Sequence, residues 1–484
     1  MLNICRVGFS RPLLLSSLLL SSFLHAETID DVMDGFDDES TPTTRSHTKH
    51  GNEKSDDIMD GFDDEPIATP SPSNLQQGSE KRVISSAKNN DGKLLGVLGE
   101  FTGKLTQQIA YSYSDDAPHD NISSLKTSLL LDYEHKFSNG FKFKTNAKAY
   151  YDSIYDIRGT EKYSKDELDE LQSEVELYDA YLEGSLSSNL DMKLGRQVVV
   201  WGRSDTIRIT DVLNPLDNRR PGMVDIEDLR LPVAMAKFDY FLGDWRITPI
   251  AVAEQHFSKN PPSGSAFNSN PRSMPEDKSY NDITPALSIG GEFSGWDINF
   301  YASRLHNDIG YFDNGKMIHD KVDMVGTAVN ILKGSWLLKS ELAHFDGLKY
   351  SSALDKEFKR TDALLGLEYN GIADTIISYD VALRNTDNYD DRLKNEPIEV
   401  KERSYQHAFR ISSDFMNATV KANYLISLFG SKMDEGGFQR AWVKYDIKDG
   451  VYANFGLVDY IGGSNRFDAV ANNDMIFTDI SYNF

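Results

Sequence analysis

The sequence predicts an all-β protein: a transmembrane antiparallel β-barrel of about 18 strands that follows a disordered, acidic N-terminal tail. Three observations lead to this prediction. Apolar and polar residues alternate in the segments after Leu98, short and long links alternate between those segments, and the last segment ends on an aromatic residue. We expect residues 1–26 to be a signal peptide, 27–95 the tail and 96–484 the barrel.

The alternation within segments is typical of strands with one apolar face. From Val420 to Ile426 every second residue is apolar, and Lys421 and Asn423 stand between them. The segment from Arg440 to Ile447 repeats the pattern. Because a charge facing lipid near the midplane costs about 2–4 kcal/mol, the polar face must line a wet lumen. A soluble β-sandwich also alternates, but its exposed sheet edges would need protection.

The links between segments predict the topology. Eight are short and rich in Gly, Asn, Asp and Ser, as at Ser138 to Gly140 and at Lys448 to Gly450. Most of the others are long and polar, as at Ser258 to Asn281. Outer-membrane barrels combine tight periplasmic turns with longer external loops. Eight turns and nine loops join about 18 strands and place both termini in the periplasm.

The C-terminal segment predicts assembly into the outer membrane of a Gram-negative cell. Ile480, Tyr482 and Phe484 share one face of the expected strand, whereas Asp479 and Ser481 share the other. An apolar closing strand that ends on Phe is typical of the assembly signal of bacterial outer-membrane barrels. We therefore expect outer-membrane lipid and the barrel-assembly machinery as partners.

The N-terminus is typical of a secretory leader. Arg6 and Arg11 precede a short apolar stretch that ends near Leu24, and Ala26 completes a small-residue cleavage site. A retained membrane anchor is the alternative, but the stretch is shorter than the roughly 20 residues of a spanning helix. The only cysteine, Cys5, lies in the leader, so the mature chain carries no thiol.

The stretch from Glu27 to Lys93 has 16 acidic and 7 basic residues and almost no strand pattern. Such a composition cannot bury enough apolar surface to offset the entropy of ordering, which predicts a disordered tail.

The tail contains a repeat. Asp30 to Glu39 reads DDVMDGFDDE, and Asp56 to Glu65 differs from it at one position only. An apolar trio in an acidic frame is typical of a short docking motif that orders on a basic groove, and duplication raises avidity. A calcium site and a solubilising spacer are the alternatives, although the ordered ligand positions of an EF-hand are not met. The predicted docking residues are Val32, Met33, Asp34, Gly35, Phe36, Ile58, Met59, Asp60, Gly61 and Phe62. The expected partner is a periplasmic or inner-membrane exporter component.

Composition excludes two broad classes of protein. A mean hydropathy of -0.46 does not fit a helical membrane protein, whereas a barrel tolerates this value because only alternate residues meet lipid. A net charge of -24 disfavours nucleic acid as a partner, since phosphates would be repelled.

The long link from Ser204 to Leu231 is rich in Arg and Asp and contains Pro215 and Pro221. It either folds inward and narrows the lumen or caps the barrel rim from outside. Arg196 presents a conflict, because its position in the alternation points it toward lipid. Either a bulge near Gly195 turns it inward, or its side chain snorkels at the membrane interface, and the sequence leaves both open. Candidate lumen and constriction residues are Arg203, Arg208, Arg219, Arg220, Arg384, Arg410, Lys421, Arg440 and Lys444.

No sequence motif indicates catalysis. We find no nucleophile elbow, metal-binding HExxH helix or Gly-rich phosphate loop, and we expect His306 and His319 on the surface like most histidines in loops. The sequence thus predicts no enzyme, no cofactor and no metal site.

The stretch from Leu194 to Leu231 carries a family resemblance. Its strand end GRQVVVWG, followed by DVLNPLD, RRPG and the LPV that begins at Leu231, resembles a proteobacterial outer-membrane family known as domain of unknown function 1302. The resemblance implies a large outer-membrane barrel without established catalysis that works beside inner-membrane exporters of the resistance-nodulation-division type. The GRQ strand is also distantly similar to alginate-export barrels.

Two functions stay open at this point. The first is a transport conduit for a solute, lipid or polymer, with the tail docking a periplasmic or inner-membrane partner. The second is a non-conducting, plugged barrel that anchors or scaffolds whatever binds the tail.

Overall fold

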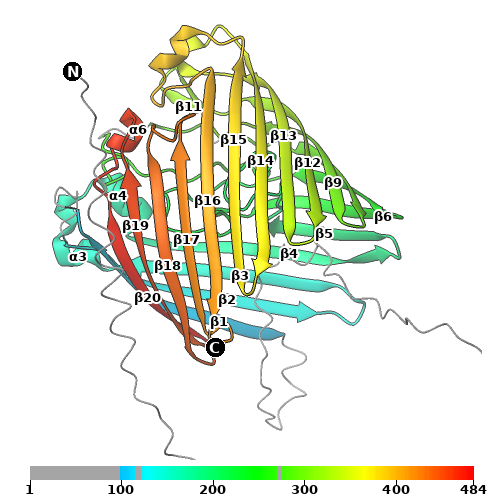
Figure 1. Ribbon diagram of the computed structural model, residues 1–484, viewed down its shortest axis with the longest axis horizontal. Coiled ribbons are helices and arrows are strands. Elements are labelled where there is room, and N and C mark those ends of the chain that lie inside the picture. The colour runs from blue at the N-terminus through cyan, green and yellow to red at the C-terminus, as the bar shows by residue number, and fades with distance from the viewer. Residues whose placement is uncertain (1–98, 115–120, 271–273, 278) are drawn as a thin grey trace, which may run out of the picture. The chain divides into compact units, whose positions relative to one another are not determined.

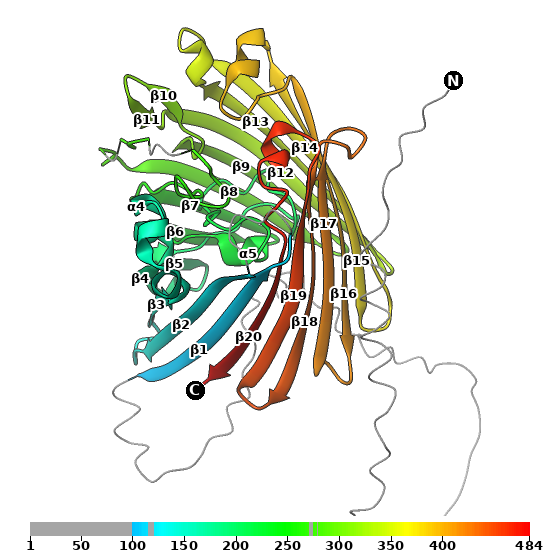
Figure 2. The same cartoon turned by 90° about the vertical axis from the view of Figure 1, so that its left-hand side faces the viewer.

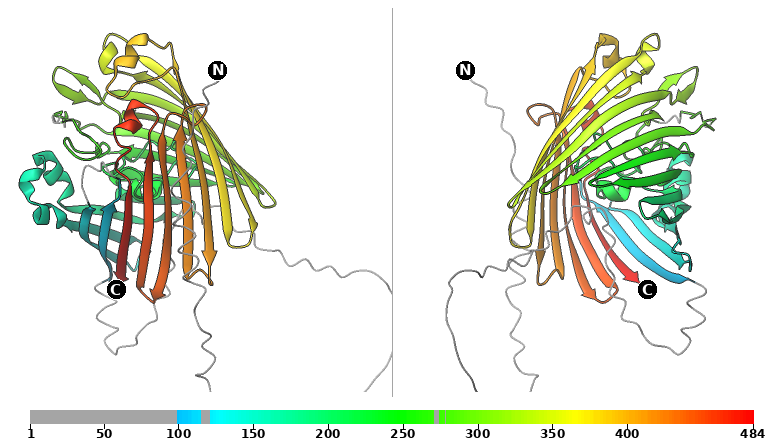
Figure 3. Two further views of the ribbon diagram at one scale, coloured as in Figure 1. Left: turned by 60° about the vertical axis from the view of Figure 1, so that its left-hand side comes forward. Right: turned by 90° about the vertical axis from the view of Figure 1, so that its right-hand side faces the viewer.

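The computed structural model describes residues 99–114, 121–270, 274–277 and 279–484. Eighteen strands form one antiparallel sheet that closes on itself as a barrel (Figures 1 and 3). Its strands are β1 (Glu100–Ser112), β2 (Asn121–Lys136), β3 (Lys142–Asp152), β4 (Ser173–Ser187), β5 (Leu190–Gln197), β6 (Val233–Leu242), β7 (Trp245–Val252), β8 (Thr284–Phe293), β9 (Trp296–His306), β12 (Lys321–Lys333), β13 (Trp336–Leu348), β14 (Phe358–Ile372), β15 (Thr375–Asp387), β16 (Arg403–Phe415), β17 (Val420–Phe429), β18 (Gly437–Lys448), β19 (Val451–Ile461) and β20 (Met475–Asn483). The predicted barrel and its strand number are confirmed.

The seam between β1 and β20 closes the ring. The two strands pair from Lys104 with Asn483 to Ser112 with Met475. Phe484 continues the pairing, because its N–H donates to the carbonyl of Gly103 at 2.9 Å and its carbonyl accepts from the Gly103 N–H at 2.8 Å. The Phe484 ring lies over Gly103, where a Cβ atom would come within 2.4 Å of it. Only glycine therefore fits this position of the seam.

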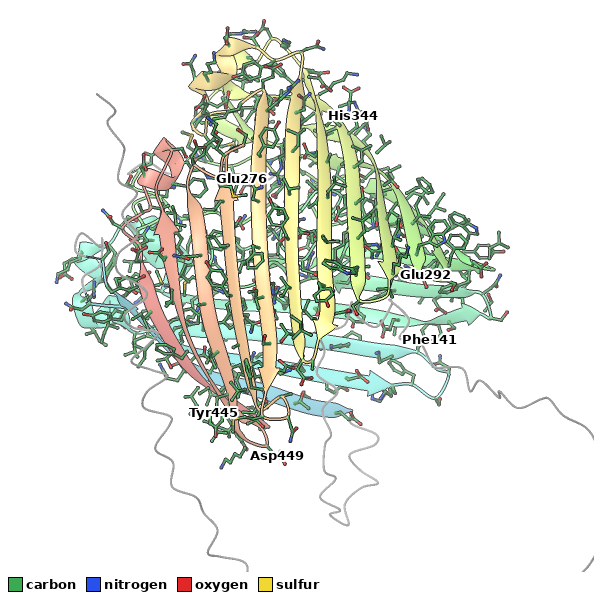
Figure 4. All side chains as sticks on the ribbon, in the orientation of Figure 1. Phe141, Glu276, Glu292, His344, Tyr445 and Asp449 are labelled. Carbon is green, nitrogen blue, oxygen red and sulfur yellow. The ribbon has the colours of Figure 1, made fainter. Side chains whose placement is uncertain are left out.

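Short and long connections lie at opposite ends of the barrel, which we name the turn end and the loop end. Figure 4 labels Phe141, Glu292 and Asp449 at the turn end. Several turns use residues with positive φ, such as Gly243 at 59° and Asp374 at 53°. Such angles suit the hairpin turns whose twist matches that of the flanking strands.

One face of the sheet is an apolar outer surface. Val325 is 57% exposed and Leu365 is 58% exposed, and each lies beside an inward residue that is buried. Aromatic side chains gather at the turn end, where Trp336 contacts Tyr369 across two strands. An apolar band with an aromatic border is the surface that lipid requires, and it identifies the outer face as the membrane face.

The long loops contain short elements that the sequence analysis missed. They are α3 (Ile154–Arg158), η2 (Thr160–Lys162), α4 (Lys165–Leu171), α5 (Ile226–Leu229), η3 (Ser351–Ala353), η4 (Asp391–Asn395), α6 (Asn465–Asp468) and the hairpin β10 (Tyr311–Asp313) and β11 (Lys316–Ile318). Ser164 is the N-cap of α4, where its side chain accepts a hydrogen bond from the N–H of Glu167. A serine at this position is the sequence signal that could have predicted α4. In the part of the chain described here, no helix is long and apolar enough to cross a membrane.

The largest apolar cluster lies on the inner side of the barrel. It joins wall residues of β6 to β16, such as Met235 and Ala343, to Val199, Trp201 and Ile207 of the link between β5 and β6. A chain segment therefore packs against the inner wall, and this segment is the candidate site.

Candidate functional site in the barrel lumen

Residues 198–232, which connect β5 to β6, lie inside the barrel, and we name them the inner segment. Figure 2 shows α5, a part of it, within the ring of strands. Ile207 and Ile209 are buried, and Thr210 is fully buried. Of the two interpretations that the sequence left open for this link, the structure shows the inward one.

The inner segment leaves and re-enters the wall through a neck built around Asn214, which is 2% exposed. Its side-chain oxygen accepts from the Val199 N–H at 2.8 Å, and its amide donates to the carbonyls of Gln197 at 3.2 Å and Leu231 at 2.8 Å. One side chain thus ties the two ends of the segment together. The neck satisfies backbone groups that no strand partner could reach.

Glu341 of β13 joins the wall to the inner segment through four hydrogen bonds. Its carboxylate is 3% exposed and accepts backbone N–H bonds from Arg203 at 2.6 Å, Ser204 at 2.9 Å and Thr210 at 3.1 Å. The Thr210 hydroxyl adds a fourth bond at 2.8 Å. A buried carboxylate is thereby held by dipoles alone, which is possible because several donors converge on it.

Further wall groups extend this attachment. Asp380 of β15 accepts from the hydroxyls of Ser204 at 2.7 Å and Thr206 at 2.6 Å. Lys339 of β13 bonds Asp205 at 3.1 Å and Glu368 of β14 at 2.9 Å.

Three of the predicted arginines hold the inner segment in place: Arg203 and Arg208 belong to the segment, and Arg384 belongs to the wall. Arg208 Nε lies 3.1 Å from Asp211, whose other neighbour is Arg230 at 2.8 Å. Arg203 pairs with Asp297 of β9. Arg384 of β15 donates to the carbonyl of Arg208 at 3.2 Å.

The inner segment also reaches the opposite wall. Asp225 lies 2.5 Å from Arg440 of β18 and 3.4 Å from Arg410 of β16. The Tyr460 hydroxyl of β19 donates to the carbonyl of Pro221 at 2.5 Å. The segment therefore spans the lumen, with its apolar side on β6 to β16 and polar contacts elsewhere.

Arg219 and Arg220 hold the segment near β3 and β4. Arg219 pairs with Asp217 at 2.6 Å and with Glu174 at 2.7 Å, and Arg220 lies 3.2 Å from Asp152. Burial tends to raise the pKa of Asp217, but hydrogen bonds from Arg219 outweigh this effect and lower that pKa below its ordinary value.

The remaining predicted residues are placed as follows. Lys421 lies on β17, 3.8 Å from Asp414, and Lys444 lies on β18, 3.9 Å from Asp446. Ile480, Tyr482 and Phe484 are about half exposed on the outer face of the seam, at 51%, 51% and 55%. The docking residues of the repeat, the signal peptide and the acidic tail lie outside the described residues.

Arg196 is held by two carboxylates. Its guanidinium lies 3.0 Å from Glu254 and 3.5 Å from Glu176. Gly195 has φ at 125°, a conformation that L side chains rarely take, but the pairing of β5 with β4 and β6 runs through it without a bulge. The ion pairs therefore satisfy the charge of Arg196 without the bulge that the sequence suggested.

The expectation that His306 and His319 lie on the surface is wrong. The His319 side chain is 4% exposed, and that of His306 is 8% exposed. His306 Nδ1 lies 2.6 Å from the His319 carbonyl and Nε2 lies 3.0 Å from Asp282. Hydrogen bonds from Lys321 and His306 lower the pKa of Asp282 to about 2. Folding of the loops over one another buries this cluster, which no local pattern signals.

The sequence analysis did not identify Glu341, Asp380 or Asn214 as anchors of the inner segment. At the turn end, a cavity of about 570 Å³ opens beside β2 to β6 and is lined by charged groups that include Lys142, Glu183 and Lys193.

Across the residues that the structure describes, no three His, Cys, Asp or Glu side chains are placed to hold a metal ion.

With this geometry in place, comparisons with known proteins assign the family. The family described as "Protein of unknown function (DUF1302)" matches residues 110–484. The chain belongs to the DUF1302 family. This DUF1302 protein folds as a β-barrel, and the signature from Leu194 to Leu231 predicted its family.

Solved structures have similar folds, and one of them, OpdK, is described as an outer membrane protein. OccAB4 of Acinetobacter baumannii is 10% identical, with a TM-score of 0.48, and the match covers 79% of this chain and 97% of that one. OpdK of Pseudomonas aeruginosa is 10% identical, with a TM-score of 0.48 and coverage of 80% and 99%. OccK2 (OpdF) of P. aeruginosa, solved with glucuronate, is 12% identical, with a TM-score of 0.47 and coverage of 80% and 98%. A search of curated proteins finds no match.

Proposed function

We propose that this DUF1302 protein is a conduit of the outer membrane whose lumen is narrowed by the inner segment. The observation that carries the proposal is an asymmetry. The large apolar cluster joins the inner segment to β6 through β16 and includes no residue of β1 to β4. On that other side most inward groups are polar, although Leu130 of β2 is apolar, and Lys148 of β3 is exposed to the lumen.

The size of the ring supports this proposal. Eighteen strands enclose more space than their side chains can fill. The inner segment meets β3 and β4 through Arg220 at Asp152 and Arg219 at Glu174, where these strands reach the loop end. We place the path beside β1 to β3, between these contacts and the turn end.

The loop end of this path is closed by a second contact. Met223 of the inner segment and Phe267 of the β7–β8 loop pack against the apolar cluster of Tyr460, Met475 and Phe477. The Phe267 and Tyr460 rings lie 5.3 Å apart. Passage requires this contact to open, which makes Phe267 the proposed gate.

The test is the conductance of the purified full-length protein in planar bilayers. Phe267→Ala combined with Asp225→Asn removes the Phe267 contact and the ion pairs of Asp225 with the far wall, and it leaves the attachment of the inner segment to Glu341 intact. We expect a larger conductance in this variant than in the wild type. Asp239→Asn, which alters a lumen carboxylate away from the inner segment, is the matched control.

A second function is favoured by the number of buried contacts that hold the inner segment across the lumen. In it, the barrel does not conduct and serves as an anchor or scaffold. No conductance in the wild type or in the double variant would support the anchor and reject the conduit.

We further propose that the repeated DGFDDE motif docks a periplasmic or inner-membrane partner, and that the barrel has no catalytic role. The duplicated apolar trio supports docking. A peptide covering residues 30–65 should capture a partner from the cell envelope, and Phe36→Ala with Phe62→Ala should lose it. Capture of the same proteins by both peptides would contradict docking through these motifs.

A further inference from the structure

We propose that four lysines on the inner face of β1 to β3, which we name the lysine face, bind and select anionic solutes. They are Lys104, Lys126, Lys144 and Lys148. The inference rests on the proposed conduit, because it assigns the substrate class to the side of the lumen that the inner segment leaves open.

The register of the strands brings these lysines onto one surface. Lys104 of β1 pairs with Leu130 of β2, and Leu130 pairs with Lys148 of β3. Lys126 lies four residues from Leu130 on the same strand, so it shares the inner face. Leu105, next to Lys104, is 45% exposed on the membrane face, and Leu131, next to Leu130, is 43% exposed there, which places Lys104 and Leu130 on the inner face.

The lysine face differs from the rest of the lumen because its charges have no counter-charge in contact. Arg440, Lys339 and Lys237 of the other walls each pair with a carboxylate. For the four lysines, no carboxylate oxygen of the described residues lies within the 4.0 Å of an ion pair. Two of them rest on aromatic rings instead: Lys126 Nζ lies 5.3 Å from the centre of Tyr150, and Lys148 Nζ lies 5.8 Å from that of Tyr178.

The acidic groups near the lysine face do not neutralise it. Asp152 is occupied by Arg220 and by the Ser124 hydroxyl at 2.6 Å, and Asp479 accepts from Asn454 at 2.9 Å. Asp228 of α5 interacts electrostatically with Lys104 and Lys148 from across the lumen. Glu134 of β2 stands opposite Lys144 but lies 3.2 Å from Lys136, and Asp179 of β4 accepts from the Asn146 side chain at 3.3 Å. Asp217 is paired with Arg219, and Asp132 is half-buried on β2. The arrangement sets positive charge on the wall against negative charge on the inner segment.

The charge of the lysine face indicates which class of solute it binds. Adjacent ammonium groups repel one another, and an anion between them relieves the repulsion, the more so inside a wall of low dielectric that focuses the field. Rings of Lys or Arg select anions in pores by the same means. The rings of Tyr150 and Tyr178 offer flat apolar surface beside the charges, so we assign small organic anions as the class.

The experiment compares wild-type full-length protein with the triple variant Lys104→Gln, Lys126→Gln, Lys148→Gln. The first readout is the reversal potential across a bilayer in a potassium chloride gradient. The second is binding of the fluorescent anion pyrenetetrasulfonate to the detergent-solubilised protein. Lys394→Gln, on an outer loop and paired with Asp391, is the matched control.

We expect anion preference in the wild type, a loss of that preference in the triple variant, and binding about 10-fold weaker, the low end of what a focused field contributes. Lys→Arg at the same three positions should retain both properties, because it keeps the charge. The control should behave as the wild type.

The outcomes separate this inference from the conduit. Conductance without anion preference, and binding unchanged by the triple variant, would reject the lysine face and leave the conduit standing. A silent barrel that still binds the probe through the three lysines would reject the conduit and retain the anion site. A silent barrel that does not bind the probe would reject both.

Discussion

Thr210 donates two hydrogen bonds to Glu341, one from its backbone N–H at 3.1 Å and one from its hydroxyl at 2.8 Å. These residues are 131 positions apart in the chain, and both are buried. Because the same carboxylate also accepts from Arg203 and Ser204, one side chain of the wall holds both arms of a turn of the inner segment.

Glu341→Gln should therefore loosen the inner segment. The substitution replaces one acceptor oxygen by an NH₂ group that faces donors, so at least one buried N–H loses its partner, at about 1–3 kcal/mol each. We expect faster cleavage of the inner segment by added protease and a lower unfolding temperature. Asp239→Asn is the control, and equal protease resistance of the two variants would contradict this role for Glu341.

Asn214→Ala should open the neck. Its side chain satisfies three buried backbone groups, of Val199, Gln197 and Leu231, and alanine satisfies none. We expect a loss of about 3 kcal/mol in the free energy of unfolding, measured by urea titration in detergent micelles. Asn423→Ala, on the lumen face of β17, should cost less than 1 kcal/mol by the same estimate for a half-buried group.

Gly103→Val should impair closure of the seam. The new side chain would collide with the Phe484 ring, which stands where the Cβ atom would lie. We expect less folded protein in outer-membrane fractions, scored by the difference in gel mobility between heated and unheated samples. Adding Phe484→Ala should restore part of the yield if the collision is the cause, whereas no recovery would point to another defect.

Leu365→Arg should destabilise the barrel in lipid. This side chain is 58% exposed on the membrane face, where an arginine near the midplane costs about 2–4 kcal/mol. Refolding into liposomes at a series of denaturant concentrations measures the change. Asn423→Arg places the same charge in the lumen and should be tolerated better, and equal losses would contradict the assignment of faces.

The loop between β19 and β20 should be more stable in acid than at neutral pH. Burial, with a contribution from Asp459, raises the pKa of Asp474 to about 6, while a hydrogen bond from the Tyr460 N–H opposes the shift. A carboxyl with a raised folded-state pKa binds its proton more tightly when folded, so stability is greatest below its unfolded pKa and falls as pH rises through 6. The protection factor of the Tyr460 amide, its hydrogen-exchange rate divided into the intrinsic base-catalysed rate at the same pH, should fall between about pH 4 and pH 7. Asp474→Asn should flatten this dependence, and a persisting slope would assign it to another group.

The strands and their faces could be predicted because they follow from local pattern. In β18, Arg440 and Lys444 point inward and Tyr445 is 47% exposed on the membrane face, as the alternation indicates. The turns were found because Gly, Asn and Asp are among the few residues that adopt positive φ at low cost.

The attachment of the inner segment could not be predicted in the same way. Asp225 and Arg440 are 215 positions apart, and nothing near either residue indicates the other. The buried state of His319 likewise depends on Phe257, a residue of another loop. The Phe257 ring stacks on the His319 ring with 3.5 Å between the ring centres.

The sequence by itself determined which residues meet lipid and which meet water, since period-two alternation and turn chemistry act between neighbours in the chain. The tertiary structure alone decided what fills the lumen. Closing the ring brings distant strands around one interior, and only then do Glu341, Asp380 and Asn214 find the backbone groups that they satisfy. Closing the ring also decides which lumen charges form an ion pair. Among the described residues, Lys148 has no carboxylate within ion-pair distance.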